Sequence, residues 1–193
     1  MATRARGLEL VTAASSRSIY LRPWRIDIAE RSGPRSPLAA SAIARCVAAA
    51  LEAAAAPEPG SVTVVLSDDE ELADLNREHM GHEGPTDVLS FPMLPPESFR
   101  RSGPDDARPR PRSMRAPLHR RSRTHIGDIA ISVERAITQA DEGRGGHTGD
   151  IRWSPADEMR LLVTHGTLHL CGWDHAEPIE EAAMRALERR LIG

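Results

Sequence analysis

The chain has 193 residues, of which 25 are Lys or Arg and 28 are Asp or Glu, and its formal net charge is −3. This length fits one domain, and the 40% of hydrophobic residues includes so few aromatic ones that we expect an aliphatic core. No apolar run approaches the ~18 residues of a membrane span, and no segment has the form of a signal peptide. Two cysteines far apart in the sequence suggest no disulfide framework, so we expect a cytoplasmic protein without membrane contact.

Two segments are predicted to lie outside the fold. Residues 1–19 carry three arginines against a single glutamate and are expected to form a flexible N-terminal tail. Residues 95–123 are dense in arginine, proline and serine, a composition that cannot build a core. We expect a disordered insertion there, which either attracts phosphate groups or is a tolerated surface insertion. The rest, residues 20–193, is expected to form a single domain.

Strands and helices alternate along this domain. In chain order we predict a strand at residues 24–29, a helix over 38–51, a strand at 61–66, a helix from Ser67 to 78, strands at 86–91 and 126–133, and helices over 134–142, from Ser154 onward and over 177–191. Ser67 and Ser154 are each followed by acidic residues, which is typical of a helix N-terminus. The pattern predicts an α+β fold (an α/β sandwich) with a small mixed sheet of about four strands packed against helices.

Three histidines near the end of the chain have the spacing of a metal site. His165 and His169 are four residues apart, so on a helix they lie on one face about one turn apart. Gly172 allows the chain to leave the helix in a left-handed conformation, and the turn can bring His175 to the same ion. Three imidazoles leave one position for water, which is the arrangement of a catalytic zinc. The pattern therefore predicts one zinc ion per chain on this helix and the turn after it.

Other ligands, other ions and a protease-type metal site are the alternatives to this prediction. Cys171, two residues past His169, points to another face and is not expected to be the fourth ligand. A structural zinc stays open, as do other divalent ions, because imidazole also suits nickel, copper and iron. The same spacing occurs in metzincin proteases, which place a glutamate directly after the first histidine as general base. Here that residue is Gly166, which cannot accept a proton. Met184 could be mistaken for the methionine of the protease Met-turn, but it falls on the apolar spacing of the last helix and is expected to pack in the core.

Residues 165–175, with the sequence HGTLHLCGWDH, resemble the signature of the YbeY family of bacterial and organellar rRNA maturation factors. Three further blocks agree, and the similarity extends over about residues 68–191; the blocks are Leu75-Asn76, PTDVLSFP at 85–92 and GDIAI at 127–131. The resemblance implies a single-strand-specific, zinc-dependent endoribonuclease acting in 16S rRNA 3′-end maturation and ribosome quality control. It also implies that His165, His169 and His175 hold the ion. The implied partners are rRNA and the ribosome or its small subunit, and not DNA.

One position departs from the family pattern. Many members carry an arginine about four residues after the asparagine equivalent to Asn76, where it meets a substrate phosphate. Here that residue is Met80. The contact is then lost, moved to Arg77 or supplied by the arginine-rich insertion.

Four further residues are candidates near the ion. Asp174, beside a ligand, either orients a histidine, acts as a base or caps the turn. Asp87 and Asp128 are candidates to line the cleft, and Asp87 also suits a hydrogen bond within a turn. Ser90 is a candidate substrate contact; it has no local base, so we do not expect it to be a nucleophile.

Two questions are left open by the sequence. The attacking group is either a zinc-bound water or the 2′-hydroxyl of the RNA. The alternative functions are a non-catalytic ribosome assembly factor braced by zinc, and a zinc hydrolase of another substrate such as a peptide. Gly166 argues against the peptidase, whereas Met80 keeps the assembly factor possible.

Overall fold

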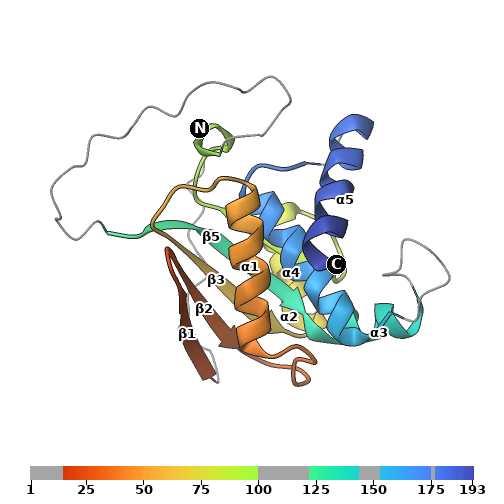
Figure 1. Ribbon diagram of the computed structural model, residues 1–193. Helices are drawn as coiled ribbons and strands as arrows, with labels where there is room; N and C mark the ends of the chain where they lie inside the picture. Colours follow the sequence, from red (N-terminus) through yellow and green to blue (C-terminus); the bar gives the residue numbers. More distant parts are fainter. Residues whose placement is uncertain (1–14, 100–121, 144–152, 175–176) are drawn as a thin grey trace, which may run out of the picture.

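A five-stranded sheet organises the described part of the computed structural model, which comprises residues 15–99, 122–143, 153–174 and 177–193 (Figure 1). The strands are β1 (Ser15–Leu21), β2 (Trp24–Glu30), β3 (Gly60–Ser67), β4 (Val88–Pro92) and β5 (Thr124–Ser132). The α-helices are α1 (Ala40–Ala53), α2 (Asp69–Leu75), α3 (Val133–Asp141), α4 (Pro155–Leu170) and α5 (Pro178–Ile192). A π-helical turn, η2 (Asn76–Met80), continues α2, and a short 3₁₀ helix, η3 (Pro96–Ser98), follows β4.

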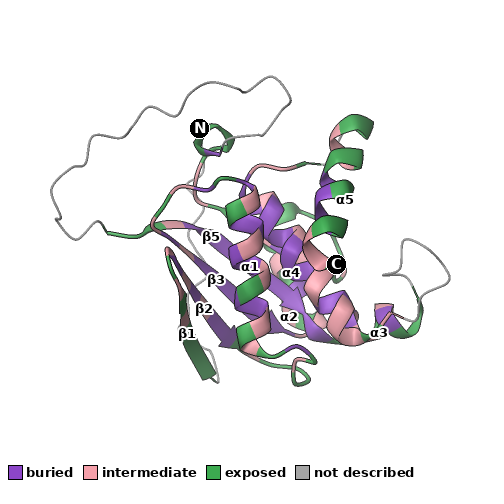
Figure 2. Cartoon of the chain, viewed as in Figure 1, coloured by how far each residue is buried: buried purple, intermediate pink, exposed green. Residues whose placement is uncertain are grey.

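The sheet is mixed and has the strand order β1-β2-β3-β5-β4. β3 lies at its centre and is parallel to β2 and β5, whereas β1 and β4 are antiparallel edge strands. β3 is rich in β-branched residues and is buried along nearly its whole length, as expected for a strand covered on both faces. Figure 2 shows the same burial for β5. The edge strand β4 is the one nearest to the histidine helix α4.

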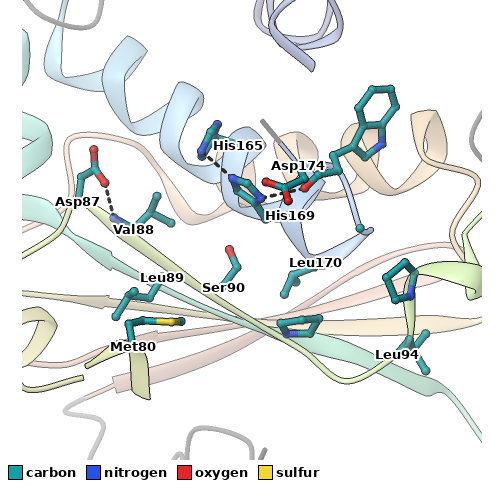
Figure 3. A pocket seen from close by; sticks show the side chains of 14 residues that line it. Met80, Asp87, Val88, Leu89, Ser90, Leu94, His165, His169, Leu170 and Asp174 are labelled. Atoms are coloured by element: carbon teal, nitrogen blue, oxygen red, sulfur yellow. Dashed lines mark hydrogen bonds between the residues drawn. The ribbon is translucent and has the colours of Figure 1, made fainter. Parts of the chain in front are cut away.

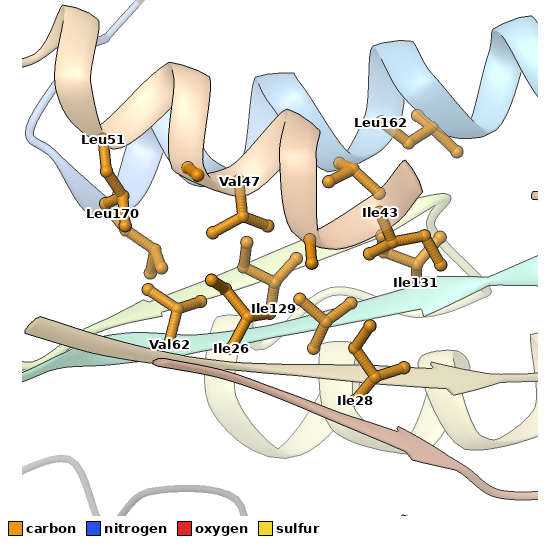
Figure 4. Close-up of a cluster of buried hydrophobic side chains, with 14 of the residues drawn as sticks. Ile26, Ile28, Ile43, Val47, Leu51, Val62, Ile129, Ile131, Leu162 and Leu170 are labelled. Carbon is orange, nitrogen blue, oxygen red and sulfur yellow. The ribbon is translucent and has the colours of Figure 1, made fainter. Parts of the chain in front are cut away.

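Helices α1 and α4 cover one face of the sheet, and the short helix α2 covers part of the other (Figure 1). Because side chains alternate along a strand, Ile129 and Ile131 of β5 pack on the α1 side, whereas Ala130 packs on the α2 side. The larger core is mainly aliphatic, as predicted, and Figure 4 shows many of its members: Ile26, Ile28, Ile43, Val47, Leu51, Val62, Ile129, Ile131, Leu162 and Leu170. Helix α5 packs outside α4 through Met184, which is buried as predicted. No helix among the described residues has the length and apolar content needed to cross a membrane.

The predicted α+β fold is confirmed, but the described sheet has five strands instead of about four. Residues 15–19, predicted to belong to a flexible tail, pair with β2 as part of β1. β1 is mostly exposed and has only Ile19 and Leu21 packed against the core, so much of its pairing comes from backbone hydrogen bonds, which hydrophobic patterning does not report. Within the predicted insertion, residues 95–99 include η3 and the buried Phe99. Residues 1–14 and 100–121 lie outside the described residues, so the tail and the insertion stay predictions there.

The helix after β3 begins later than predicted. Its N-cap is Asp68, whose carboxylate accepts a hydrogen bond from the Glu71 backbone N–H at 2.9 Å. Ser67 still belongs to β3, and its hydroxyl donates to the Glu71 side chain. After Leu75 the helix continues as η2 and ends at Gly81, which is left-handed with a φ of 72°.

Candidate metal centre

Helix α4 carries two of the predicted ligands and is fixed at both ends. It begins with a capping box in which Ser154 Oγ accepts from the Asp157 backbone N–H and the Asp157 carboxylate accepts from the Ser154 N–H, both at 3.2 Å. It ends at Gly172, which has the predicted left-handed conformation with a φ of 77°. The N–H groups of Gly172 and Trp173 donate back to the last turn of α4. This turn sets the direction of the Trp173 carbonyl.

The structure brings the imidazoles of His165 and His169 together. Their Nε2 atoms are 3.0 Å apart at the wall of a pocket (Figure 3). His165 Nδ1 lies 2.7 Å from Glu188 Oε1 of α5, and His169 Nδ1 lies 2.9 Å from the Trp173 carbonyl oxygen. An ionised carboxylate and a carbonyl oxygen only accept hydrogen bonds, so each Nδ1 carries the proton. Both Nε2 atoms therefore present a lone pair to the same point.

This donor set fits a metal ion. Two nitrogen lone pairs at this distance repel unless a shared proton or a metal cation lies between them. Two nitrogens bound at ~2.0–2.1 Å to one tetrahedral ion lie ~3.3 Å apart, close to the observed 3.0 Å. A carboxylate or carbonyl on the far nitrogen is also the usual environment of a metal-bound histidine. His165 and His169 could thus hold one ion between them.

The remaining predicted ligand, His175, lies outside the described residues. In the ranges that the structure covers, no three His, Cys, Asp or Glu side chains form a metal-ligand set by themselves. Cys171, which was not expected to be a ligand, is buried in the core, and burial raises the pKa of its thiol to about 12. Because a metal binds the thiolate, this environment disfavours coordination by Cys171.

An open pocket of about 510 Å³ lies between β4 and the C-terminal half of α4 (Figure 3). This volume is in the range of small-ligand sites. Its polar lining residues are Asp87, Ser90, His165, His169 and Asp174. Its other lining residues are Met80, Val88, Leu89, Pro92, Leu94, Pro96, Leu170, Gly172 and Trp173. None of the described lining residues is a lysine or an arginine, so, apart from the two histidines, the side chains of the pocket do not themselves attract a phosphate.

Asp87 and Ser90, predicted as substrate contacts, both line this pocket. The Asp87 carboxylate accepts from the Val88 backbone N–H at 2.8 Å and from Gln139 Nε2 at 3.2 Å, so it orders the start of β4. The Ser90 hydroxyl donates to the Gly166 carbonyl at 3.0 Å and ties β4 to α4. Each side chain thus has a structural task as well as a place at the pocket wall.

Arg77 and Asp128 lie away from the pocket lining. Arg77 is exposed and pairs with Asp74 at 2.5 Å. Asp128 was expected beside Asp87 in the cleft, but its carboxylate lies 2.9 Å from His125 Nε2 on the α2 side of the sheet. That expectation is wrong, because alternation along β5 directs Asp128 to the face opposite α4.

Met80 and Asp174 lie at the pocket. Met80 lines it and is 43% exposed, so the position where the family arginine is missing is a pocket position. Asp174 is exposed and lies beside His169 (Figure 3). Whether Asp174 orients a histidine or acts as a base stays a prediction.

Gly166 allows α4 to lie directly on the sheet. A Cβ at this position would be 2.9 Å from Ile129 Cγ2 and 3.0 Å from Val88 Cγ2. Both contacts are too short for ordinary carbon atoms, so a larger residue does not fit without movement. The residue after the first histidine therefore faces the sheet, and packing as well as chemistry excludes a protease-type base there.

The two groups that hold the histidines were not predicted. Trp173 contributes a backbone carbonyl, which no side-chain pattern reveals. Glu188 is 4% exposed and lies on the core-facing stripe of α5 with Met184 and Leu187. The sequence places Glu188 four residues after Met184, on the same helix face, but gives no sign that it approaches His165.

Comparison with known proteins shows to which family this sequence is related. Residues 30–193 match the family model described as "Endoribonuclease YbeY". The chain belongs to the YbeY family. This confirms the resemblance inferred from the sequence motifs, and the YbeY match includes β4, α4 and all of α5.

Three curated relatives carry the name Endoribonuclease YbeY. The Thermobifida fusca protein is 38% identical over 167 residues, which are 86% of this chain and 91% of the relative. The Salinispora tropica protein is 36% identical over 167 residues, 86% of this chain and 93% of the relative. The Symbiobacterium thermophilum protein is 41% identical over 132 residues, 68% of this chain and 69% of the relative. A Thermotoga maritima protein with a solution structure aligns with a TM-score of 0.47 and 21% identity over 86% of each chain.

Proposed function

We propose that this YbeY-family chain is a single-strand-specific, zinc-dependent endoribonuclease that acts in 16S rRNA 3′-end maturation and ribosome quality control. The name shared by the family and its curated relatives supports RNA cleavage. The observation that carries the proposal is the pair of Nε2 atoms that face each other, 3.0 Å apart, at the wall of an open pocket. His165, His169 and His175 would hold one zinc per chain. The corresponding partners are rRNA and the small ribosomal subunit in the cytoplasm.

The residues around the proposed ion would have separate roles in the reaction. When bound, zinc supplies a Lewis acid for the phosphate and lowers the pKa of a water molecule. Trp173 and Glu188 keep the Nδ1 protons of the two histidines in place, so that both Nε2 atoms stay available. Asp174, which lines the pocket, would accept the proton of the attacking hydroxyl, which comes from water or from the RNA 2′-hydroxyl.

The pocket walls favour an unpaired strand. Trp173 contributes an aromatic ring to the pocket lining, on which an unstacked base could lie. A base within a duplex is stacked and paired, so it is not available for such contacts. The polar lining includes two carboxylates and no lysine or arginine among the described residues. A phosphate therefore enters favourably only when the histidines hold a divalent cation.

That same charge pattern favours a second candidate function, a ribosome assembly factor in which zinc braces α4 and the turn after it. Met80 occupies the pocket position where the family arginine would meet a phosphate. Without this cation the pocket could bind a ribosomal partner and stabilise it without turnover. This candidate predicts one zinc per chain, binding to the small subunit and no cleavage.

Elemental analysis combined with an RNA cleavage assay tests the proposal. We expect one zinc per chain, cleavage of a single-stranded rRNA fragment that stops after chelation, and recovery when zinc is added back. The same fragment annealed to its complement should stay intact. One zinc per chain without cleavage would support the assembly factor instead, and the absence of bound metal would exclude both.

A further inference from the structure

A buried carboxylate lies where helix α5 should be apolar. Glu188 is 4% exposed and follows Leu187 on the stripe that packs against α4 and α1. A charged group at such a position is costly to bury unless a partner stabilises it, and apolar residues of similar size usually pack there at least as well. The packing of α5 therefore does not explain why this residue is a glutamate.

The contact that Glu188 makes points to the histidine pair. Its Oε1 atom lies 2.7 Å from His165 Nδ1, a short distance typical of a charge-assisted hydrogen bond. The opposite nitrogen of the same ring, Nε2, faces His169 Nε2 at 3.0 Å. The His165 imidazole thus contacts a carboxylate through Nδ1 and faces the candidate metal position through Nε2.

A carboxylate at this position determines which nitrogen of His165 carries the proton. An ionised carboxylate can only accept, so it holds the imidazole as the tautomer with its proton on Nδ1 and its lone pair on Nε2. It also fixes the plane of the ring and makes Nε2 a better donor to a cation. An amide in the same place could reverse its orientation and donate to Nδ1, which would favour the tautomer with Nε2 protonated.

We propose that Glu188 is the positioning residue of the metal centre: it fixes the tautomer and ring plane of His165 and thereby sets metal affinity. This inference rests on the proposed zinc function and adds the C-terminal helix to the site. The two ligands of α4 are then oriented by different means. His169 is held by a backbone carbonyl that follows from the turn at Gly172, whereas His165 depends on a side chain of another helix.

The test compares zinc affinity in Glu188→Gln and in the full-length wild type by competition with a chromophoric chelator. We expect affinity to fall by ~10–100-fold in Glu188→Gln. Glu188→Asp, which keeps the charge on a shorter side chain, should recover part of the loss. Glu181→Gln is the matched control, because Glu181 lies on the same helix but pairs with Arg185 at the surface. Its zinc affinity should stay within twofold of wild type.

A second measurement does not depend on bound metal. Nitrogen chemical shifts of the metal-free protein should show His165 protonated at Nδ1 in wild type and partly protonated at Nε2 in Glu188→Gln. Thermal stability of the metal-free Gln variant should equal or exceed that of wild type, because a buried charge is removed.

The outcomes separate the two proposals. Wild-type zinc affinity in Glu188→Gln, together with an unchanged His165 tautomer, overturns the role of Glu188 while leaving the zinc site intact. A wild-type protein that binds no zinc overturns the proposed function itself. If Glu188→Gln does not fold, as judged by circular dichroism, the Asp variant decides: unchanged affinity together with lowered metal-free stability shows that Glu188 serves packing only.

Discussion

Two histidine–carboxylate pairs lie on opposite sides of the same sheet, and they differ in their surroundings although they are built alike. His165 lies 2.7 Å from Glu188, and His125 lies 2.9 Å from Asp128. In both pairs the carboxylate side chain is almost fully buried, at 5% and 3% exposure, while the imidazole is partly exposed, at 28% and 39%. Distance and burial therefore do not distinguish a site from a structural contact.

The second nitrogen of each ring makes the distinction. His125 Nδ1 lies 3.3 Å from the Ser61 hydroxyl on the neighbouring strand, so both of its nitrogens are used within the sheet. His165 Nε2 instead faces His169 at the wall of an open pocket. A buried carboxylate next to a histidine thus indicates a metal centre only where the far nitrogen is directed at another donor and at accessible space.

The largest expected effect separates the two pairs directly. His165→Ala removes one Nε2 from the pocket, and we expect it to abolish zinc binding and to reduce RNA cleavage by at least ~10³-fold, since the charge stabilisation supplied by the metal is worth several kcal/mol. His125→Ala is the matched control and should keep both zinc and cleavage. Metal analysis and initial cleavage rates of the two variants check this. Equal losses in both variants would contradict the distinction.

A smaller effect is expected from restoring a cation to the pocket. Met80→Arg places a guanidinium among described lining residues that include two carboxylates and no lysine or arginine. One added phosphate contact is worth ~1 kcal/mol, so we expect RNA to bind about fivefold more tightly. The salt dependence of binding should also steepen by ~0.7 in log–log slope. Met80→Gln controls for polarity without charge, and an equal gain in that variant would argue against a phosphate contact.

The packing of α4 on β4 gives a third prediction. Gly166→Ala gains ~1 kcal/mol of helix propensity but drives a methyl group into Ile129 and Val88, a clash that costs ~1–3 kcal/mol. We expect a net loss of about 1 kcal/mol in the free energy of unfolding, measured by urea titration. Adding Val88→Ala removes one clashing methyl and should make the effect of Gly166→Ala smaller than in the wild-type background. Additive effects would show that α4 shifts without contacting Val88.

The sequence predicted much of this arrangement because the relevant signals are local. The capping box at Ser154, the left-handed Gly172 and the i, i+4 histidines are each specified within a few residues, and the structure shows all three features. What could not be predicted depends on contacts between distant segments. Glu188 approaches His165 only through the packing of α5 on α4, and the face taken by Asp128 follows from the register of β5 in the sheet.

The smallest expected effect is confined to the structural pair and has a defined pH dependence. The hydrogen bond that His125 donates to the Asp128 carboxylate raises the pKa of His125 above its usual value; partial burial opposes this effect, and the negative charges of Asp128 and the nearby Asp27 add to it. Because the folded-state pKa is the higher one, the stabilisation is fully present below the unfolded-state value of ~6.5 and is lost as the pH rises through the folded-state value. His125→Gln keeps an N–H donor for Asp128 but cannot be charged.

We therefore expect wild type to exceed His125→Gln in free energy of unfolding by less than about 1 kcal/mol at acidic pH, since the imidazole is partly exposed. This difference should shrink as the pH rises from below ~6.5 through the higher folded-state pKa, as followed by denaturant titrations at a series of pH values. His82→Gln, at an exposed loop position, should show no such trend. A difference that grows with pH would mean that the hydrogen bond to Asp128 stabilises the neutral form of His125. The His125–Asp128 and His165–Glu188 pairs would then be alike only in the distance between imidazole and carboxylate.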